Sequence, residues 1–124
     1  MAKAGLRIVF VGIESINPES IKKTKRQNAP IDKQLRSIKI LEKNGISVKA
    51  MFIFGFPGDS LKNALKTINY ALSLPITYLQ FSVFTPYPGT PIFKEYENKI
   101  TAQNYEQYTQ WDLVFNHENL TNLG

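Results

Sequence analysis

Three short, nearly continuous apolar runs divide the chain, at residues 6–13, 48–54 and 78–84. Each has the length of a strand and is rich in β-branched and aromatic residues, which is typical of strands buried on both faces of a parallel sheet. A polar segment with helical spacing follows each run. The pattern therefore predicts strands that alternate with helices.

The first connection contains two helix signals. Asn17 and Pro18 suit an N-cap followed by the first helical position, and this short basic helix should end near Arg26. Pro30 starts a second helix, which Gly45 ends. The apolar face of that helix is formed by four residues with helical spacing: Ile31, Leu35, Ile38 and Leu41.

The second connection predicts a helix that Asp59 or Ser60 can cap and that Pro75 ends. Its predicted buried stripe is Leu61, Ala64, Leu65, Ile68, Ala71 and Leu72. A further helix is expected at about 92–98, and residues 111–115 suit a fourth strand or an edge ribbon. The order β-α-β-α-β-α indicates an α/β fold with right-handed parallel crossovers.

Composition narrows the classes of function. The 124 residues suit one domain, and a hydrophobic content of 43% excludes general disorder. The absence of cysteine excludes disulfides, thiolate zinc sites, cysteine nucleophiles and an iron–sulfur cluster held by this chain alone. Neither a membrane-spanning apolar run nor a signal-peptide layout is found, so we expect a cytoplasmic protein without a membrane partner.

The net charge of +5 is unevenly distributed, because residues 1–49 hold 11 basic and four acidic side chains. Clustered cations can bind the phosphates of a nucleic acid. Lys and Arg are also common on the solvent-exposed faces of ordinary helices. We favour the second interpretation, since no aromatic residues interleave the basic cluster as single-strand binding requires.

Parallel α/β folds bind ligands at the carboxyl ends of their strands. The first run ends in Glu14 and Ser15, a carboxylate beside a hydroxyl, which suits the hydroxyl groups of a sugar. The same two residues can instead cap the helix that follows. Both interpretations remain open on the sequence.

The loops after the other two runs are rich in Gly and Pro. Gly55 allows a backbone to approach a flat ligand closely, although its surroundings also suit a tight turn. Residues 85–91 contain three prolines and should present Tyr87 on a stiff loop. Near the end of the chain, the single histidine His117 is interpreted as a bystander. The tail also holds four aromatic residues, which we interpret as packing it against the sheet rather than as a platform for bases: Tyr105, Tyr108, Trp111 and Phe115.

Taken together, Val-Gly-Ile-Glu-Ser at 11–15, Ile-Phe-Gly-Phe-Pro-Gly-Asp at 53–59 and Pro-Tyr-Pro-Gly-Thr-Pro at 86–91 resemble the radical S-adenosylmethionine (radical SAM) superfamily. The resemblance implies the second half of a partial (β/α)6 TIM-like barrel, an α-β horseshoe. Residues 1–98 would form that half of the core and 99–124 a post-barrel tail. The nearest branch often carries a cobalamin-binding domain and includes the anaerobic magnesium-protoporphyrin IX monomethyl ester cyclases.

The resemblance also assigns cofactor contacts by position. Glu14 and Ser15 match the motif that contacts the ribose and the methionyl part of SAM. Arg26 stands where the branch usually has a basic residue, which could pair with the SAM carboxylate, although a solvated helix arginine also fits. The remaining assigned positions form the adenine wall: Ile53, Gly55, Phe84 and Thr85.

The family's three-cysteine loop, which holds the [4Fe–4S] cluster, does not occur in this sequence. The implied cluster ligands therefore lie outside this chain, to which no catalytic or metal-ligating residue is assigned. The resemblance implies the SAM-binding half of an enzyme that reductively cleaves SAM, inactive on its own. It allows cobalamin in the full-length protein and leaves the substrate undefined.

Two other functions fit the residues without the resemblance. One is a stand-alone basic α/β module that binds RNA or an acidic protein partner. The other is a cysteine-free structural domain that assembles only with a partner chain. Whatever its function, a half-barrel of three parallel strands leaves sheet edges unpaired, so we expect the chain on its own to form a homodimer through the truncated edge at the first strand.

Overall fold

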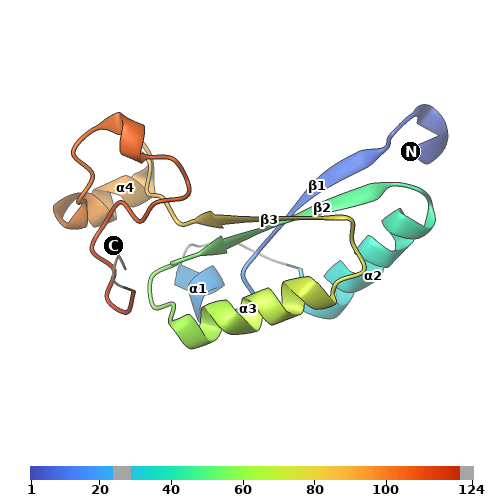
Figure 1. Ribbon diagram of the computed structural model, residues 1–124, viewed down its shortest axis with the longest axis horizontal. Coiled ribbons are helices and arrows are strands. Elements are labelled where there is room, and N and C mark those ends of the chain that lie inside the picture. The colour runs from blue at the N-terminus through green and yellow to red at the C-terminus, as the bar shows by residue number, and fades with distance from the viewer. Residues whose placement is uncertain (24–28, 121–124) are drawn as a thin grey trace.

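The computed structural model describes residues 1–23 and 29–120, which contain a three-stranded parallel sheet (Figure 1). Its strands, in spatial order, are β1 (Ile8–Glu14), β2 (Ser47–Phe54) and β3 (Tyr78–Val83). The three predicted strands and the α/β class are thereby confirmed.

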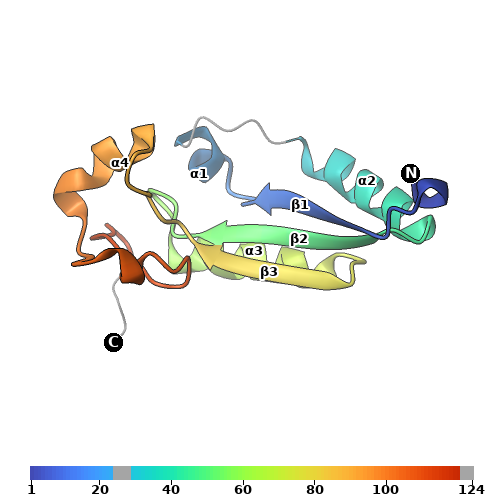
Figure 2. The same ribbon diagram turned by 90° about the horizontal axis from the view of Figure 1, so that it is seen from above.

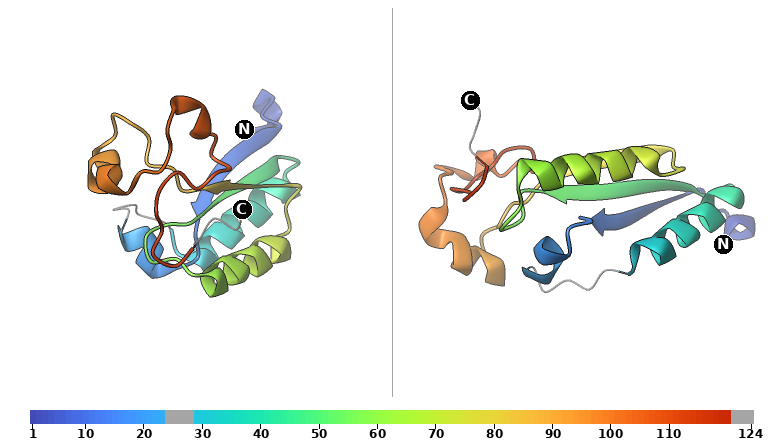
Figure 3. Two further views of the ribbon diagram at one scale, coloured as in Figure 1. Left: turned by 60° about the vertical axis from the view of Figure 1, so that its left-hand side comes forward. Right: turned by 90° about the horizontal axis from the view of Figure 1, so that it is seen from below.

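The helices begin close to the predicted residues, and the predicted end of the first helix, near Arg26, lies outside the described residues. They are α1 (Pro18–Lys23), α2 (Ile31–Lys43), α3 (Leu61–Ser73) and α4 (Pro91–Tyr96), with 3-10 turns at Ala2–Ala4, Glu97–Lys99 and Tyr105–Gln107. Gly45 follows α2 with a φ of 72°, the left-handed conformation expected of a C-terminal glycine. Figure 2 shows β2 and β3 in front of α3, and the view from below in Figure 3 shows α2 and α3 in front of the strands. The long helices therefore cover one face of the sheet.

The main core lies between the sheet and these helices. Val48, Ala50 and Phe52 of β2 are fully buried against Ile38 of α2 and Ala71 of α3. The opposite face is open among the described residues, and Phe10 of β1 is 63% exposed there. Burial on both faces, as predicted for the first strand, is therefore wrong for this chain, because helices pack on one face only.

The predicted buried stripe of α3 is also partly wrong. Ser60 caps the helix by accepting a 3.3 Å hydrogen bond from the Asn63 N–H. Leu61, Leu65 and Leu72 are more than half exposed, whereas Thr67 and Ala71 are buried. Tyr70 of the helix also faces the core, where its ring lies edge-to-face with that of Phe52, at 6.5 Å between centroids.

A second cluster lies beyond the carboxyl ends of the strands, where α4 and the tail lie in Figure 1. Phe84, which follows β3, packs edge-to-face against Phe115 with ring centroids 5.9 Å apart. Residues 111–115 form no strand: Phe115 makes one isolated antiparallel bridge, with Ile100. Of the four aromatic residues expected to pack the tail, Phe115 and Tyr108 do so, whereas Trp111 and Tyr105 are 64% and 80% exposed.

No helix within the described ranges is both long enough and apolar enough to cross a lipid bilayer.

Candidate functional site

A pocket of about 530 Å³ opens at the carboxyl ends of the strands. The ends of all three strands contribute to it, together with the proline-rich loop, α4 and one residue of the tail. Four of the seven residues assigned from the sequence line this pocket: Glu14, Ile53, Phe84 and Thr85. Residues from distant parts of the chain converge here because parallel strands end at the same edge of a sheet.

Glu14 reaches the pocket from an irregular end of β1. The register between β1 and β2 shifts between Gly12 and Glu14, and Glu14 has a φ of 68°. A side chain in this left-handed region is uncommon, and such bulges are found where a strand redirects a side chain. The carboxylate is a hydrogen-bond acceptor at the rim of the pocket.

Ser15 lies beside the pocket rather than in its lining. Its side chain is buried, and its Oγ accepts a 3.0 Å hydrogen bond from the Asn17 N–H. Asn17 in turn accepts from the Glu19 N–H at 3.2 Å, as an N-cap does. Ser15 thus closes the turn that leads into α1.

Two other assigned positions are Arg26 and Gly55. Arg26 lies outside the described residues. Gly55 is buried with a φ of 77°, and a Cβ there would contact Val83, Leu113 and Leu120 at 3.8–3.9 Å. In this chain Gly55 makes the tight turn between β2 and the loop that follows.

Asp59 is buried and bonded to both neighbouring loops. Its carboxylate accepts hydrogen bonds from the Asn17 side-chain amide at 3.1 Å, from the Phe56 N–H at 3.1 Å, and from the Ser20 hydroxyl. Its main-chain oxygen accepts a 3.1 Å bond from the Asn119 side chain. This carboxylate therefore fixes the loops that flank the pocket.

Several polar residues of the pocket were not recognised from the sequence. Gln80 and Ser82 of β3 lie on the open face, Glu95 comes from α4, and Gln110 comes from the tail with a φ of 70°. The alternation of Gln80 and Ser82 with apolar neighbours was a usable signal, since alternate residues of a strand share one face. Gln110 carried no such signal. Its main-chain oxygen accepts a 2.7 Å bond from the Val83 N–H, which joins the tail to β3.

The lining of the pocket is suited to a flat ligand with hydroxyl groups. Ile53 and Phe84 supply apolar surface, while Glu14 and Thr85 supply hydrogen-bonding groups. Among the described residues of the lining there is no Lys or Arg. The charges present therefore favour a neutral or cationic ligand over a phosphate.

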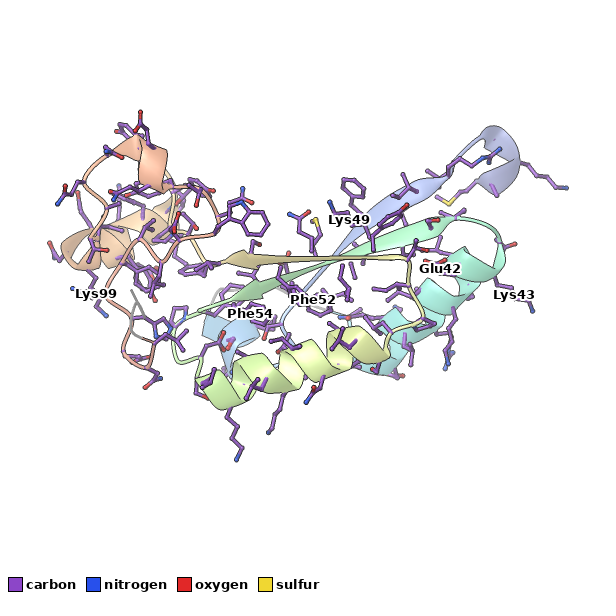
Figure 4. All side chains as sticks on the ribbon, in the orientation of Figure 1. Glu42, Lys43, Lys49, Phe52, Phe54 and Lys99 are labelled. Atoms are coloured by element: carbon purple, nitrogen blue, oxygen red, sulfur yellow. The ribbon has the colours of Figure 1, made fainter. Side chains whose placement is uncertain are left out.

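The open face continues from the pocket along the sheet. Figure 4 shows Lys49 on this face and Phe52 and Phe54 on the side that the helices cover. The Lys49 Nζ lies 5.0 Å from the centroid of the Phe10 ring, a cation–π contact. Phe54 stacks on Phe81, with centroids 5.2 Å apart.

A second pocket, of about 300 Å³, lies between α4 and the tail. His117 lines it and is bonded on both sides: its Nε2 lies 3.0 Å from the Phe56 oxygen, and its Nδ1 accepts from the Asn119 and Leu120 N–H groups. This pattern assigns the proton to Nε2. His117 is therefore not the bystander that the sequence suggested, because its hydrogen bonds link the tail to the loop after β2.

Tyr96 also borders this second pocket. Burial, followed by the charges of Glu95 and Glu118, raises the pKa of its phenol. The hydroxyl therefore stays protonated at neutral pH. Within the described ranges, no three His, Cys, Asp or Glu side chains come together as a metal site would require.

Comparison with known proteins shows which family this chain resembles in sequence. Residues 1–71 match the Radical SAM superfamily. The bacteriochlorophyllide d C-12(1)-methyltransferase of Chlorobaculum tepidum is 28% identical over 118 residues, which cover 95% of this chain and 26% of that relative. The anaerobic magnesium-protoporphyrin IX monomethyl ester cyclase of Rubrivivax gelatinosus is 26% identical over 106 residues, 86% of this chain and 19% of the cyclase.

A solved structure is similar as well. The radical SAM methyltransferase TsrM of Kitasatospora setae, determined with cobalamin and a [4Fe–4S] cluster bound, superposes with a TM-score of 0.67 at 25% identity. The superposition covers 78% of this chain and 18% of TsrM. The chain thus spans about a quarter or less of the length of the proteins it matches. Because the family match covers more than half of its residues, the chain belongs to the radical SAM superfamily, in the branch that includes the anaerobic magnesium-protoporphyrin IX monomethyl ester cyclases.

Proposed function

We propose that this chain is the SAM-binding half of a radical SAM enzyme, and that the 530 Å³ pocket holds the adenosine part of SAM. The observation that carries the proposal is the convergence of Glu14, Ile53, Phe84 and Thr85 on that one pocket. These residues come from three separate strand ends. Their positions along the chain match the SAM-contacting motifs of the family, and this match does not depend on their arrangement in space.

The polar and apolar side chains that line the pocket fit the proposed ligand. Glu14 accepts the ribose hydroxyl hydrogens, because an ionised carboxylate is an acceptor only. Ile53 and Phe84 flank the adenine, and Thr85 offers a hydroxyl at its edge. The absence of basic residues among the described lining suits SAM, whose sulfonium and ammonium groups are cationic.

The redox chemistry depends on groups outside this chain. A [4Fe–4S] cluster bound beside SAM would supply the electron for the reductive cleavage of SAM that the family uses. The sequence contains no cysteine, so the cluster ligands belong to another part of the protein. The role of this chain is to bind SAM, orient it and shield it from water. On this account the chain alone does not cleave SAM.

We propose further that residues 1–98 are the second half of a partial (β/α)6 barrel and that 99–124 follow it as a tail. The parallel order β1-β2-β3 and the single helix-covered face suit such a half-barrel. In that arrangement the open face of the sheet becomes the barrel interior. The names of the relatives indicate methyl transfer and cyclisation, and either reaction is compatible with this pocket.

The test is SAM affinity in the full-length protein. Glu14→Ala should weaken SAM binding by about 1–3 kcal/mol, roughly 5- to 150-fold, because buried hydroxyl groups lose a charged acceptor. Glu106→Ala, at an exposed tail carboxylate outside both pockets, is the matched control and should leave the affinity unchanged. Equal affinities for both variants would contradict the proposed role of Glu14.

A further inference from the structure

The carboxylate of Glu14 occupies the space that a side chain at residue 12 would need. An ideal Cβ built on Gly12 would lie 2.6 Å from the Glu14 Oε1 and 3.3 Å from its Cδ. Atoms do not approach so closely, so any residue other than glycine would displace this carboxylate. The Glu14 side chain therefore folds back over β1 and lies above Gly12.

The backbone of Gly12 does not itself require glycine. The glycines with positive φ in the described residues are Gly5, Gly45, Gly55, Gly58 and Gly89, and Gly12 is not one of them. An alanine could adopt the conformation of Gly12 without backbone strain, and glycine within a strand is normally unfavourable for stability. The need for glycine here comes from Glu14.

The local geometry of β1 directs the Glu14 side chain to this place. The bulge between Gly12 and Glu14 and the left-handed backbone of Glu14 turn its side chain toward the pocket. Strained residues of this kind persist where the surrounding structure holds them, and they gather at ligand sites. Gly12 then provides the space in which the carboxylate rests.

We propose that Gly12 is a positioning residue for ligand recognition: its missing side chain seats the Glu14 carboxylate where it meets vicinal hydroxyl groups of the ligand. The proposal rests on the proposed function, in which those hydroxyls belong to the ribose of SAM. A carboxylate that accepts two hydroxyl hydrogens needs a fixed orientation, and small displacements weaken such contacts. Gly12 itself makes no contact with the ligand.

The experiment measures SAM affinity and thermal stability of the full-length protein together. Gly12→Ala should weaken SAM binding about tenfold or more and leave the melting temperature unchanged or slightly raised. Gly45→Ala is the matched control: its positive φ makes alanine strained, so the melting temperature should fall while SAM affinity stays the same. If Gly12 has only a structural role, Gly12→Ala should instead lower the melting temperature and leave SAM affinity unchanged.

A double variant tests whether the effect of Gly12→Ala on SAM affinity depends on Glu14. In a Glu14→Ala background the Cβ at residue 12 meets no carboxylate, so adding Gly12→Ala should change SAM affinity less than twofold. The same background removes the crowding, and it keeps the comparison usable if Gly12→Ala alone folds poorly.

The outcomes separate the two proposals. If Glu14→Ala weakens binding and Gly12→Ala does not, only the positioning role of Gly12 is overturned. If Gly12→Ala weakens binding equally in both backgrounds, its effect bypasses Glu14 and the inference is again wrong. If Glu14→Ala leaves SAM affinity unchanged, the proposed function loses its ribose contact and the inference is overturned with it.

Discussion

Asn17 and Asp59 lie 42 positions apart in the chain, yet the Asn17 side-chain amide donates a 3.1 Å hydrogen bond to the Asp59 carboxylate. The Ser20 hydroxyl donates to the same oxygen, and the Phe56 N–H donates to the other. Since Asp59 is buried, these bonds join the segment after β1 to the loop after β2. The two segments that flank the pocket are thus held by one carboxylate.

Removing that carboxylate should destabilise the fold. In Asp59→Ala, the donors on Asn17, Ser20 and Phe56 lose their acceptor in a buried place, and the free energy of unfolding should fall by about 3 kcal/mol. Asp112→Ala is the control, because this exposed carboxylate accepts one 2.7 Å bond, from Thr109, and should cost less than about 1 kcal/mol. Urea unfolding measures both values, and similar losses would contradict the role given to Asp59.

The sequence predicted the features that follow from local pattern. Three apolar runs predicted three strands. The resemblance to the radical SAM superfamily assigned Glu14, Ile53 and Phe84 to one ligand, and the rule that parallel strands end at one edge explains why they meet. The cap of α3 was also predicted, since Ser60 was one of two alternatives.

Other features depend on contacts that no local pattern encodes. The periodicity of α3 describes a broad apolar arc, and only tertiary packing decides that Thr67 rather than Leu65 faces the sheet. Gln110 reaches the pocket through one hydrogen bond between the tail and Val83. Its left-handed backbone has no sequence signal, because glutamine rarely adopts it.

Tyr70→Phe should stabilise the protein. The Tyr70 hydroxyl is buried and finds no hydrogen-bond partner within the described part of the chain, and burial raises the pKa of its phenol. Removing the hydroxyl should increase the free energy of unfolding at neutral pH by about 1 kcal/mol. Tyr78→Phe, at a hydroxyl-bearing side chain that is half exposed on β3, is the control and should change it little.

The same substitution should alter the response to alkali. Above the ordinary tyrosine pKa of 10.0, the unfolded chain ionises Tyr70 while the folded protein keeps it neutral, so the wild type loses stability as pH rises. The variant lacks this loss, and its advantage should therefore widen above pH 10. A stability difference that is constant from neutral pH into this range would contradict the assignment.

The free energy of unfolding of variants at residue 110 should depend on how easily the new residue adopts a positive φ. Gln110 has a φ of 70°, which glycine adopts freely and β-branched residues hardly adopt at all. We expect Gln110→Gly to remain within about 1 kcal/mol of the wild type and Gln110→Val to lose about 2 kcal/mol or more. Guanidinium unfolding of the three proteins checks the order. If valine proves as stable as glycine, the backbone of the tail at this position is not the one described.

The outer strand β1 offers an apolar edge at which the chain could associate with a second copy of itself. β1 is an outer strand of the sheet, and its Ile8 and Phe10 side chains are 43% and 63% exposed. An apolar edge strand can pair with another chain. We propose that the 124-residue chain on its own forms a dimer through β1, and that Phe10→Lys weakens it. Sedimentation equilibrium should give twice the mass of 14.1 kDa, and a monomer throughout the micromolar range would show the proposal to be wrong.

The central claim is that the pocket at the strand ends holds the adenosine of SAM, and a crystal structure of the full-length protein with SAM tests it most directly. The account predicts that the ribose hydroxyls lie within hydrogen-bonding distance of the Glu14 carboxylate, above Gly12, with the adenine between Ile53 and Phe84. SAM bound elsewhere, with Glu14 outside contact range of the ribose, would contradict it.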